Sequence, residues 1–184
     1  MLDEALITKC IEGNRAAQEQ LYNFYARRMR GVCVRYAKSD FEAEDIFQEA
    51  FVKVFRYLKN FKMQGSFDGW VRRIVVNTAI DHYKANLSNN NQVHLDVVED
   101  YQLCSVEMPA DLEVEDMMRI LEKLPDGYKM VFNLYAIEGY SHKEIADMLN
   151  ISEGTSKSQL SKSRKYIQVL FQQNSIEEND TRTN

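Results

Sequence analysis

The sequence predicts an all-α protein composed of small helical domains. The chain of 184 residues contains only 7 Gly and 2 Pro, too few for the many tight turns of a β sandwich or barrel. Apolar residues recur every three or four positions along most of the chain, as they do in amphipathic helices. Asn14, Ser141 and Ser152 stand directly ahead of such stretches, where helix N-caps belong. The length suits one or two small domains.

The charge of the chain is unevenly distributed. The net charge is -5, but residues 1–84 contain 14 Lys and Arg against 11 Asp and Glu, and residues 117–171 contain 8 against 6. Residues 85–116 contain 8 acidic residues and no Lys or Arg. Because salt screens charges beyond about 8–10 Å, each basic block can meet DNA independently of the acidic segment.

The cysteines and the N-terminus predict a cytoplasmic location. Cys10, Cys33 and Cys104 are widely separated and form no CxxC pair, as expected for reduced thiols. The N-terminus is acidic, and no long apolar run follows it. We therefore expect no signal peptide and no membrane insertion.

Residues 5–86 are predicted to form the first helical domain. Asn14 is the expected N-cap of a helix whose apolar residues recur at helical spacing: Leu21, Phe24, Tyr25, Met29 and Val32. Two further helices are expected at about 40–58 and about 67–84, separated by a polar loop at 62–66. The apolar stripe of the first of these two helices is Phe47, Phe51, Val54, Phe55 and Leu58.

Residues 87–110 are predicted to form an acidic flexible linker, because they contain an Asn run and no regular apolar period. A second helical domain is expected at 111–173, and a disordered tail at 174–184. The first helix of this domain carries Leu112, Met117, Leu121 and Leu124 and stops at Pro125-Asp126-Gly127. A second helix is expected from Tyr128 to Ile137, with Val131, Phe132 and Tyr135 facing inward.

The next stretch predicts a helix-turn-helix. Ser141 and Glu144 have the spacing of a capping box at the start of a short helix. Asn150 suits the left-handed turn that follows, and Ser152 caps a second helix with Leu160, Ile167 and Leu170 on its buried side. In such a motif the second helix enters the major groove of DNA.

Polar and basic side chains occupy the solvent side of this second helix. Lys can neutralise phosphates, whereas Ser, Thr and Gln can hydrogen-bond to base edges. The candidate DNA contacts are Lys143, Thr155, Lys157, Ser158, Gln159, Ser161, Lys162 and Lys165. An ordinary helical hairpin with a solvated basic face remains the alternative.

Two stretches resemble one protein family. Asp45-Ile-Phe-Gln48-Glu49-Ala-Phe51, followed by Phe67 to Asp81, is similar to the second conserved region of extracytoplasmic-function sigma factors. Leu124-Pro125, then Glu138 to Ala146 and Ile151 to Thr155, resembles their fourth region. The order, the spacing and the intervening linker agree over about 10–171. The resemblance implies a factor that gives bacterial RNA polymerase its promoter specificity.

The resemblance implies a polymerase-binding face on the helix at 40–58. Its polar residues lie opposite the aromatic stripe: Asp45, Gln48, Glu49 and Arg56. In the family, this face docks on the clamp helices of the largest polymerase subunit. From the residues alone, a merely solvated face is the alternative.

The family also melts the downstream (−10) promoter element and holds a flipped base. Capture of single-stranded DNA uses aromatic, basic and polar side chains. The candidates are Phe61, Lys62, Gln64, Ser66, Phe67, Trp70, Arg73 and Asn77. Plain core packing is the alternative for Trp70 and especially for Phe67. Asn77 requires a polar partner if it is buried.

The sequence departs from the family pattern in the helix-turn-helix. Ser156 replaces a branched apolar residue, Gln159 replaces an Arg, and Lys162-Ser163 replaces an Arg-Ala pair. A buried Ser156 is expected to loosen the hairpin by about 1 kcal/mol unless its hydroxyl is bonded. The family further implies contact with the upstream (−35) promoter element and an anti-sigma partner.

The residues alone leave two other functions open. A stand-alone helix-turn-helix regulator would bind duplex DNA without polymerase. An enzyme could use Glu42, Asp45 and Glu49 as metal ligands, but His82, His94 and His142 are dispersed, and no phosphate-binding loop or zinc spacing occurs. We therefore expect neither a cofactor nor a catalytic activity of the chain itself.

Overall fold

The computed structural model describes residues 3–89 and 119–181, with side chains described for 3–87 and 119–171. Within these ranges the regular structure is helical and contains no strand, which confirms the all-α prediction. The chain divides into two compact units, Met1–Asn91 and Gln92–Asn184.

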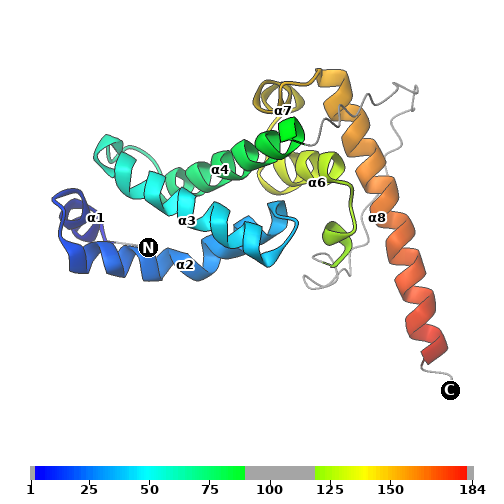
Figure 1. Ribbon diagram of the computed structural model, residues 1–184, viewed down its shortest axis with the longest axis horizontal. Helices are drawn as coiled ribbons and strands as arrows, with labels where there is room; N and C mark the ends of the chain where they lie inside the picture. The colour runs from blue at the N-terminus through cyan, green and yellow to red at the C-terminus, as the bar shows by residue number, and fades with distance from the viewer. Residues whose placement is uncertain (1–2, 90–118, 182–184) are drawn as a thin grey trace. The chain divides into compact units, whose positions relative to one another are not determined.

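The first unit is a bundle of helices. Helices α2, α3 and α4 pack alongside one another, and α1 folds against the start of α2 (Figure 1). The elements are α1 (Glu4–Ile11), α2 (Arg15–Tyr36), α3 (Asp40–Tyr57), the 3-10 turn η1 (Leu58–Asn60) and α4 (Phe67–Asn89). The side chain of Asn14 accepts a hydrogen bond from the Ala17 amide, which confirms the predicted N-cap of α2.

The core of the first unit follows the predicted apolar stripes. Leu21, Tyr25 and Met29 of α2 are buried, as are Phe47, Phe51, Val54 and Leu58 across the interface. Phe24 lies outside this core and is 50% exposed. One residue before Tyr25 on a helix is a rotation of about 100°, which turns Phe24 toward solvent.

Helix α4 is longer than the sequence predicted. It ends at Asn89 instead of near Lys84. Asn86 donates from Nδ2 to Glu42 Oε1 of α3 at 2.6 Å, which ties the last turns of α4 to the bundle. Residues 87–89, assigned to the linker, are therefore helical, and the remainder of the predicted linker lies outside the described residues.

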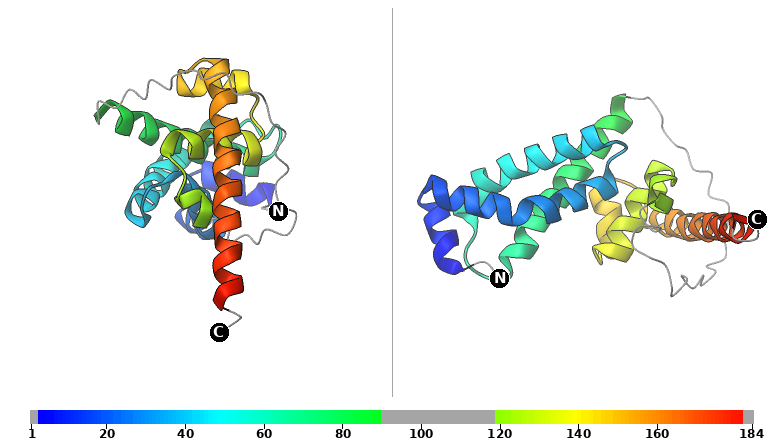
Figure 2. Two further views of the ribbon diagram at one scale, coloured as in Figure 1. Left: turned by 90° about the vertical axis from the view of Figure 1, so that its right-hand side faces the viewer. Right: turned by 90° about the horizontal axis from the view of Figure 1, so that it is seen from below.

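The second unit is arranged around a long helix. Helices α6 and α7 lie beside the first half of α8 (Figure 2). The elements are α6 (Asp126–Phe132), a π-helical turn η2 (Asn133–Ile137), α7 (His142–Leu149) and α8 (Glu153–Thr181). Most of the helix predicted at 111–124, including Leu112 and Met117, lies outside the described residues. Leu121 and Leu124 are buried.

The structure confirms the helix-turn-helix. Ser141 and Glu144 make both hydrogen bonds of a capping box, and Asn150 is left-handed with φ 57° and ψ 47°. Leu160 and Ile167 are buried, whereas Leu170 and Tyr135 are only partly covered.

Two secondary-structure predictions in this unit need correction. The helix expected at 128–137 changes to π geometry from Asn133 onward. The tail expected to be disordered from residue 174 is helical to Thr181, because no Gly or Pro interrupts the run of helix-compatible residues in α8.

Asn150 provides a test of the turn between α7 and α8. Glycine adopts φ near +57° without a Cβ penalty, whereas a β-branched residue does not. We expect Asn150→Gly to leave the protection of α7 and α8 amides unchanged or increased, and Asn150→Val to lower their opening free energy by about 1–2 kcal/mol. Hydrogen exchange of the full chain measures both. Equal protection in the two variants would contradict this account of the turn.

Candidate functional site

The outer face of α3 carries the predicted polar residues. Asp45, Gln48, Glu49 and Arg56 are all exposed, as the helical spacing requires. Gln48 donates from Nε2 to Glu44 at 2.7 Å, and Glu44 in turn accepts from Arg30 of α2. Asp45 is also exposed, and within the described residues its carboxylate makes no hydrogen bond or ion pair.

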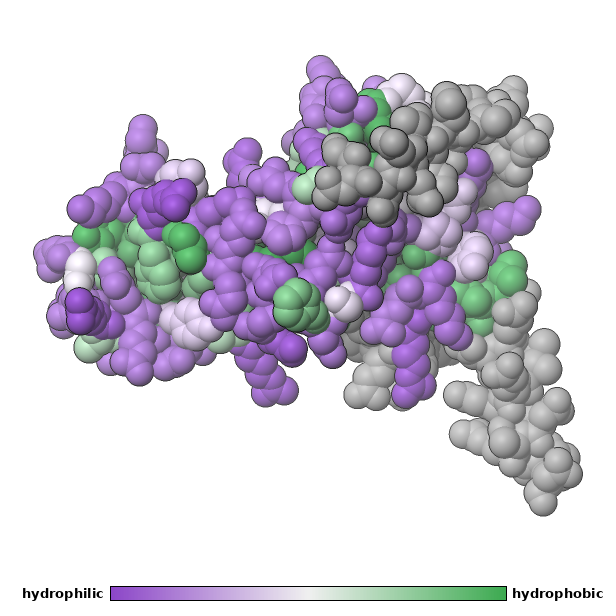
Figure 3. Space-filling model, viewed as in Figure 1, coloured by the Kyte–Doolittle hydropathy of each residue, from purple (hydrophilic) through white to green (hydrophobic). Residues whose placement is uncertain are grey.

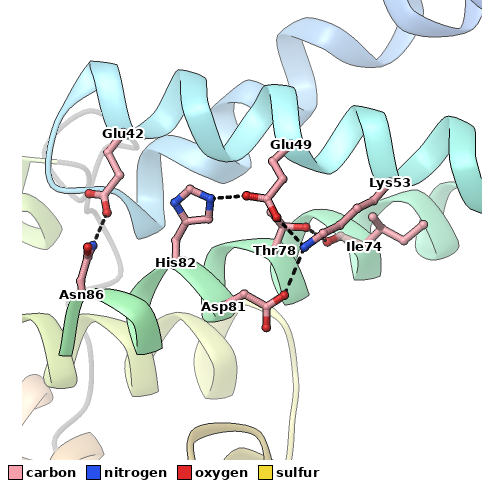
Figure 4. A network of polar contacts seen from close by, with 8 residues as sticks. All are labelled: Glu42, Glu49, Lys53, Ile74, Thr78, Asp81, His82 and Asn86. Carbon is pink, nitrogen blue, oxygen red and sulfur yellow. Dashed lines mark hydrogen bonds and ion pairs between the residues drawn. The ribbon is translucent and has the colours of Figure 1, made fainter. Parts of the chain in front are cut away.

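Glu49 belongs to a polar network between α3 and α4 (Figure 4). Its carboxylate contacts Lys53 Nζ at 2.8 Å and His82 Nε2 at 2.7 Å. Lys53 also reaches Asp81 at 3.2 Å. The hydrogen bond from Lys53 and then that from His82 lower the pKa of Glu49 below its usual 4.5. Glu49 thus holds two helices together, which the sequence did not predict.

Two large apolar side chains share the exposed face with Asp45 and Gln48. Phe41 is 78% exposed and Val52 is 56% exposed. The four residues follow a spacing of 4, 3 and 4, which keeps them on one side of a helix. The sequence shows this spacing, but the predicted polymerase-binding face contained only polar residues and did not include Phe41 and Val52. Figure 3 shows isolated hydrophobic residues on a mainly hydrophilic surface.

An aromatic cluster closes the loop between η1 and α4. The Phe67 ring stacks on Trp70 with centroids 5.5 Å apart, and Phe61 lies 5.0 Å from Phe67 and 5.5 Å from Trp70. Phe61 and Phe67 are buried, whereas Trp70 is partly exposed. The structure therefore puts the two Phe rings beneath the surface and leaves Trp70 as the accessible ring.

The other candidates around this cluster are accessible. The exposed residues are Lys62, Gln64, Ser66, Arg73 and Asn77. Ser66 Oγ accepts from the Gly69 amide at 3.2 Å and so also caps α4. Because Asn77 is exposed, it does not need a buried polar partner. Aromatic, basic and amide groups are thus gathered on one surface of the first unit.

The predicted DNA-reading residues lie along the uncovered side of α8 and at the start of α7. Lys143, Lys157 and Lys165 are exposed, and the partly exposed members are Thr155, Ser158, Gln159, Ser161 and Lys162. Thr155 Oγ1 lies 2.9 Å from Ser152 Oγ, and Lys157 pairs with Glu153 at 2.7 Å. Buried Leu160 and Ile167 fix the opposite side of α8 against the unit.

Ser156 is fully buried, and its hydroxyl is satisfied. Its Oγ lies 2.9 Å from Nδ1 of His142 on α7. The imidazole stacks on the Tyr135 ring with centroids 4.5 Å apart. The Arg164 guanidinium lies 5.9 Å from the centroid of the same Tyr135 ring. Ser163 Oγ likewise donates to the Leu160 carbonyl at 2.7 Å. The polar departures in α8 therefore do not leave unpaired groups.

The described residues contain neither a metal-ligand cluster nor a helix suited to span a membrane. In residues 3–89 and 119–181, no three His, Cys, Asp or Glu side chains converge as metal ligands. Of the three carboxylates considered for a metal, Glu42 bonds to Asn86 and Glu49 to Lys53. None of the helices in the described part of the chain combines the length and apolar content needed to span a bilayer.

The fold defines an all-helical protein of two units whose C-terminal unit contains a helix-turn-helix, a motif typical of DNA-binding proteins. The family model for sigma-70 region 2 matches residues 21–88, and that for sigma-70 region 4 matches residues 115–167. The chain belongs to the sigma-70 family of sigma factors, in its extracytoplasmic-function group.

Named relatives are similar over nearly the whole chain. The RNA polymerase sigma-H factor of Pseudomonas aeruginosa is 28% identical over 92% of this chain and 94% of that protein. The ECF RNA polymerase sigma-E factor of Haemophilus influenzae is 26% identical over 94% of this chain and 96% of that protein.

Two solved structures share the fold. The sigma factor RpoE of Bartonella quintana, in complex with the anti-sigma factor NepR, matches 84% of this chain and 96% of its own with a TM-score of 0.51 and 20% identity. CnrH, in complex with the cytosolic domain of CnrY, matches 92% of this chain and 97% of its own with a TM-score of 0.50 and 22% identity.

The Glu49 network predicts a change in acid stability. Since the folded chain lowers the pKa of Glu49, its stabilisation is present above pH 4.5 and is lost as the pH falls through the lowered value. Glu49→Gln should lower the free energy of unfolding at pH 7 by no more than about 1 kcal/mol, because the pair is partly solvated. It should also flatten the stability profile below pH 4.5.

Urea unfolding of the first unit, followed by Trp70 fluorescence, measures this profile. Glu19→Gln, an exposed substitution on α2, is the matched control. A profile for Glu49→Gln that superimposes on the wild type would contradict the network's contribution.

Proposed function

We propose that the protein, a sigma factor acting in transcription initiation, uses three surfaces for three steps. The outer face of α3 docks on the clamp helices of core RNA polymerase. The aromatic loop surface captures the melted −10 element, and α8 reads the −35 element. The observation that carries the proposal is that all three surfaces lie on the uncovered sides of the units matched by regions 2 and 4.

The outer face of α3 combines exposed apolar side chains with a carboxylate, which supports docking on another protein. Phe41 and Val52 present apolar area, and Asp45 between them presents a carboxylate. Large exposed apolar side chains flanked by polar groups are typical of protein interfaces. A carboxylate can pair there with Arg through charge-assisted hydrogen bonds. Glu49 contributes by holding α3 on α4, since its oxygens already contact Lys53 and His82.

The surface around Trp70 supports capture of single-stranded DNA. The accessible indole of Trp70 packs on the buried rings of Phe61 and Phe67, which hold it rigidly. It can therefore stack against an unpaired base. Lys62 and Arg73 can neutralise phosphates, and Gln64 and Asn77 can hydrogen-bond to a base edge. The buried positions of Phe61 and Phe67 support a positioning role for these two residues.

The α8 surface supports reading of duplex DNA. A recognition helix with Thr, Ser, Gln and Lys on its outer side can contact both base edges and phosphates. We further propose an anti-sigma partner, since CnrH and RpoE were solved with the cytosolic domain of CnrY and with NepR. Polymerase itself carries out the chemistry, in the cytoplasm.

Reconstitution with core polymerase tests the whole assignment. We expect the chain to comigrate with core enzyme and to direct initiation at defined sites selected from genomic DNA. Specific duplex binding without polymerase, combined with no initiation, would instead support the stand-alone regulator.

The α3 surface makes a prediction about core binding. Asp45→Ala and Phe41→Ser should each weaken core binding by roughly 1–2 kcal/mol, because each removes a side chain that the proposed interface would bury. Competition for core enzyme against labelled wild type measures the change. Asp147→Ala on α7 and Phe24→Ser on α2 are matched exposed controls. Wild-type competition by both α3 variants would refute the docking face.

Trp70 makes a separate prediction about promoter opening. Trp70→Ala should reduce opening by roughly tenfold or more, since stacking on an aromatic ring contributes about 1–3 kcal/mol per base. Trp70→Phe should restore part of it. Permanganate reactivity of unpaired thymines at a selected promoter reports opening, while core affinity should stay at the wild-type value. Normal opening in Trp70→Ala would remove Trp70 from the site.

A further inference from the structure

His142 occupies an unusual position in the helix-turn-helix. It is the first residue of α7, yet its ring packs on Tyr135 of η2 and bonds to Ser156 of α8. Three elements therefore fix one imidazole. Ser156 is fully buried, so this hydrogen bond is protected from water and holds the ring in one orientation.

The orientation of the ring determines which nitrogen remains accessible. Nδ1 is engaged by Ser156 Oγ at 2.9 Å. Nε2 lies on the far edge of an imidazole from Nδ1, and no described side chain or backbone group of residues 3–89 and 119–181 bonds to it. His142 is itself partly exposed. Its Nε2 is thus available to a ligand that approaches from outside the unit.

The groups around His142 are mainly cationic. Lys157 and Arg164 of α8 face it, and Lys143 follows it on α7. Glu153 of α8 pairs with Lys157, so these two charges largely cancel, and Arg164 and Lys143 supply the excess positive charge. Glu144 of α7 is turned back onto Ser141 as a helix cap, and Tyr135 presents its ring. Such a cluster attracts an anion with several oxygens, such as a DNA phosphate.

Ser156 allows the imidazole to change its charge in place. A hydroxyl can donate to the bare Nδ1 of neutral His and can accept from the Nδ1–H of charged His. A branched apolar residue at this position could do neither. The hydrogen bond therefore survives protonation, and Nε2 keeps its direction in both states.

We propose that His142 Nε2 contacts a DNA phosphate when α8 binds the −35 element, and that His142 takes up a proton in this step. The proposal rests on the proposed function, because it requires DNA in the groove-facing position of α8. In a helix-turn-helix, the first helix crosses the DNA backbone, which brings the start of α7 to a phosphate.

The direction of the coupling follows from the electrostatics. In the free protein, burial first, and then Lys157 and Arg164, lower the pKa of His142 below its usual 6.5. A phosphate beside Nε2 adds negative charge and neutralises these cations, so it favours the charged imidazole. By linkage, DNA affinity rises as the pH falls, by about tenfold for each unit by which DNA raises the pKa.

Titration of the imidazoles in the full chain tests the proposal directly. The chain has 3 His, and the signal of His142 is identified as the one absent from His142→Asn. The probe is a short duplex with the upstream half of a promoter selected by the reconstituted holoenzyme. NMR should show a higher pKa of His142 with DNA than without it, while His82 in the other unit serves as the internal control.

Binding of the same duplex between pH 8 and pH 5.5 supplies the second readout. Asn carries its amide near the position of Nδ1, so His142→Asn can keep the bond to Ser156 but lacks Nε2 and the titrating charge. We expect weaker binding at low pH and a flatter pH profile in this variant, with unchanged amide protection of α7 and α8. His142→Gln, whose amide reaches toward Nε2, should bind with a similarly flat profile.

The outcomes separate the two proposals. An unchanged pKa of His142 in saturating DNA, or the same pH profile in wild type and His142→Asn, overturns only the proposed role of His142. The assignment of α8 to the −35 element would then stand. Failure of the wild type to bind the duplex at any pH overturns both this role and the assignment of α8.

Discussion

The burial of one face of each helix determines where the functional surfaces lie. In the first unit, the Phe47, Phe51 and Val54 side of α3 is enclosed by the bundle, so Asp45 and Phe41 can only point outward. In the second unit, Leu160 and Ile167 fix one side of α8, and the opposite side is the one proposed to read DNA. A helix that rotated by one residue would exchange buried and exposed groups at a cost far above any single surface contact.

Polar contacts refine this arrangement where apolar packing leaves freedom. Ion pairs among Glu49, Lys53, Asp81 and His82 connect α3 to α4 beside the proposed docking face. The hydrogen bond between His142 and Ser156 connects α7 to α8 beside the face proposed to read DNA. Both sets of polar contacts lie next to a proposed contact surface, so they hold the side chains of that surface in place for a partner. Each therefore links stability to binding, because breaking it alters the position of a neighbouring contact.

The sequence predicted what depends on local periodicity and capping. The helical class, the caps at Asn14 and Ser141, the left-handed Asn150 and the outward faces of α3 and α8 all follow from spacing along the chain. The ends of helices were less predictable: α4 continues to Asn89, and its Asn86 bonds to Glu42, which lies 44 residues before Asn86 in the sequence. Propensity alone does not contain such a long-range contact.

The sequence by itself determined which residues face solvent on α3 and α8, because a period of 3.6 residues assigns every side chain to one face once the apolar stripe is known. The tertiary structure alone decided that Trp70 is accessible above buried Phe61 and Phe67, that Glu49 is a tie between helices, and that Ser156 bonds to His142. These facts depend on side-chain packing between particular residues, most of them far apart in the sequence, and a one-dimensional pattern carries no distance between such residues.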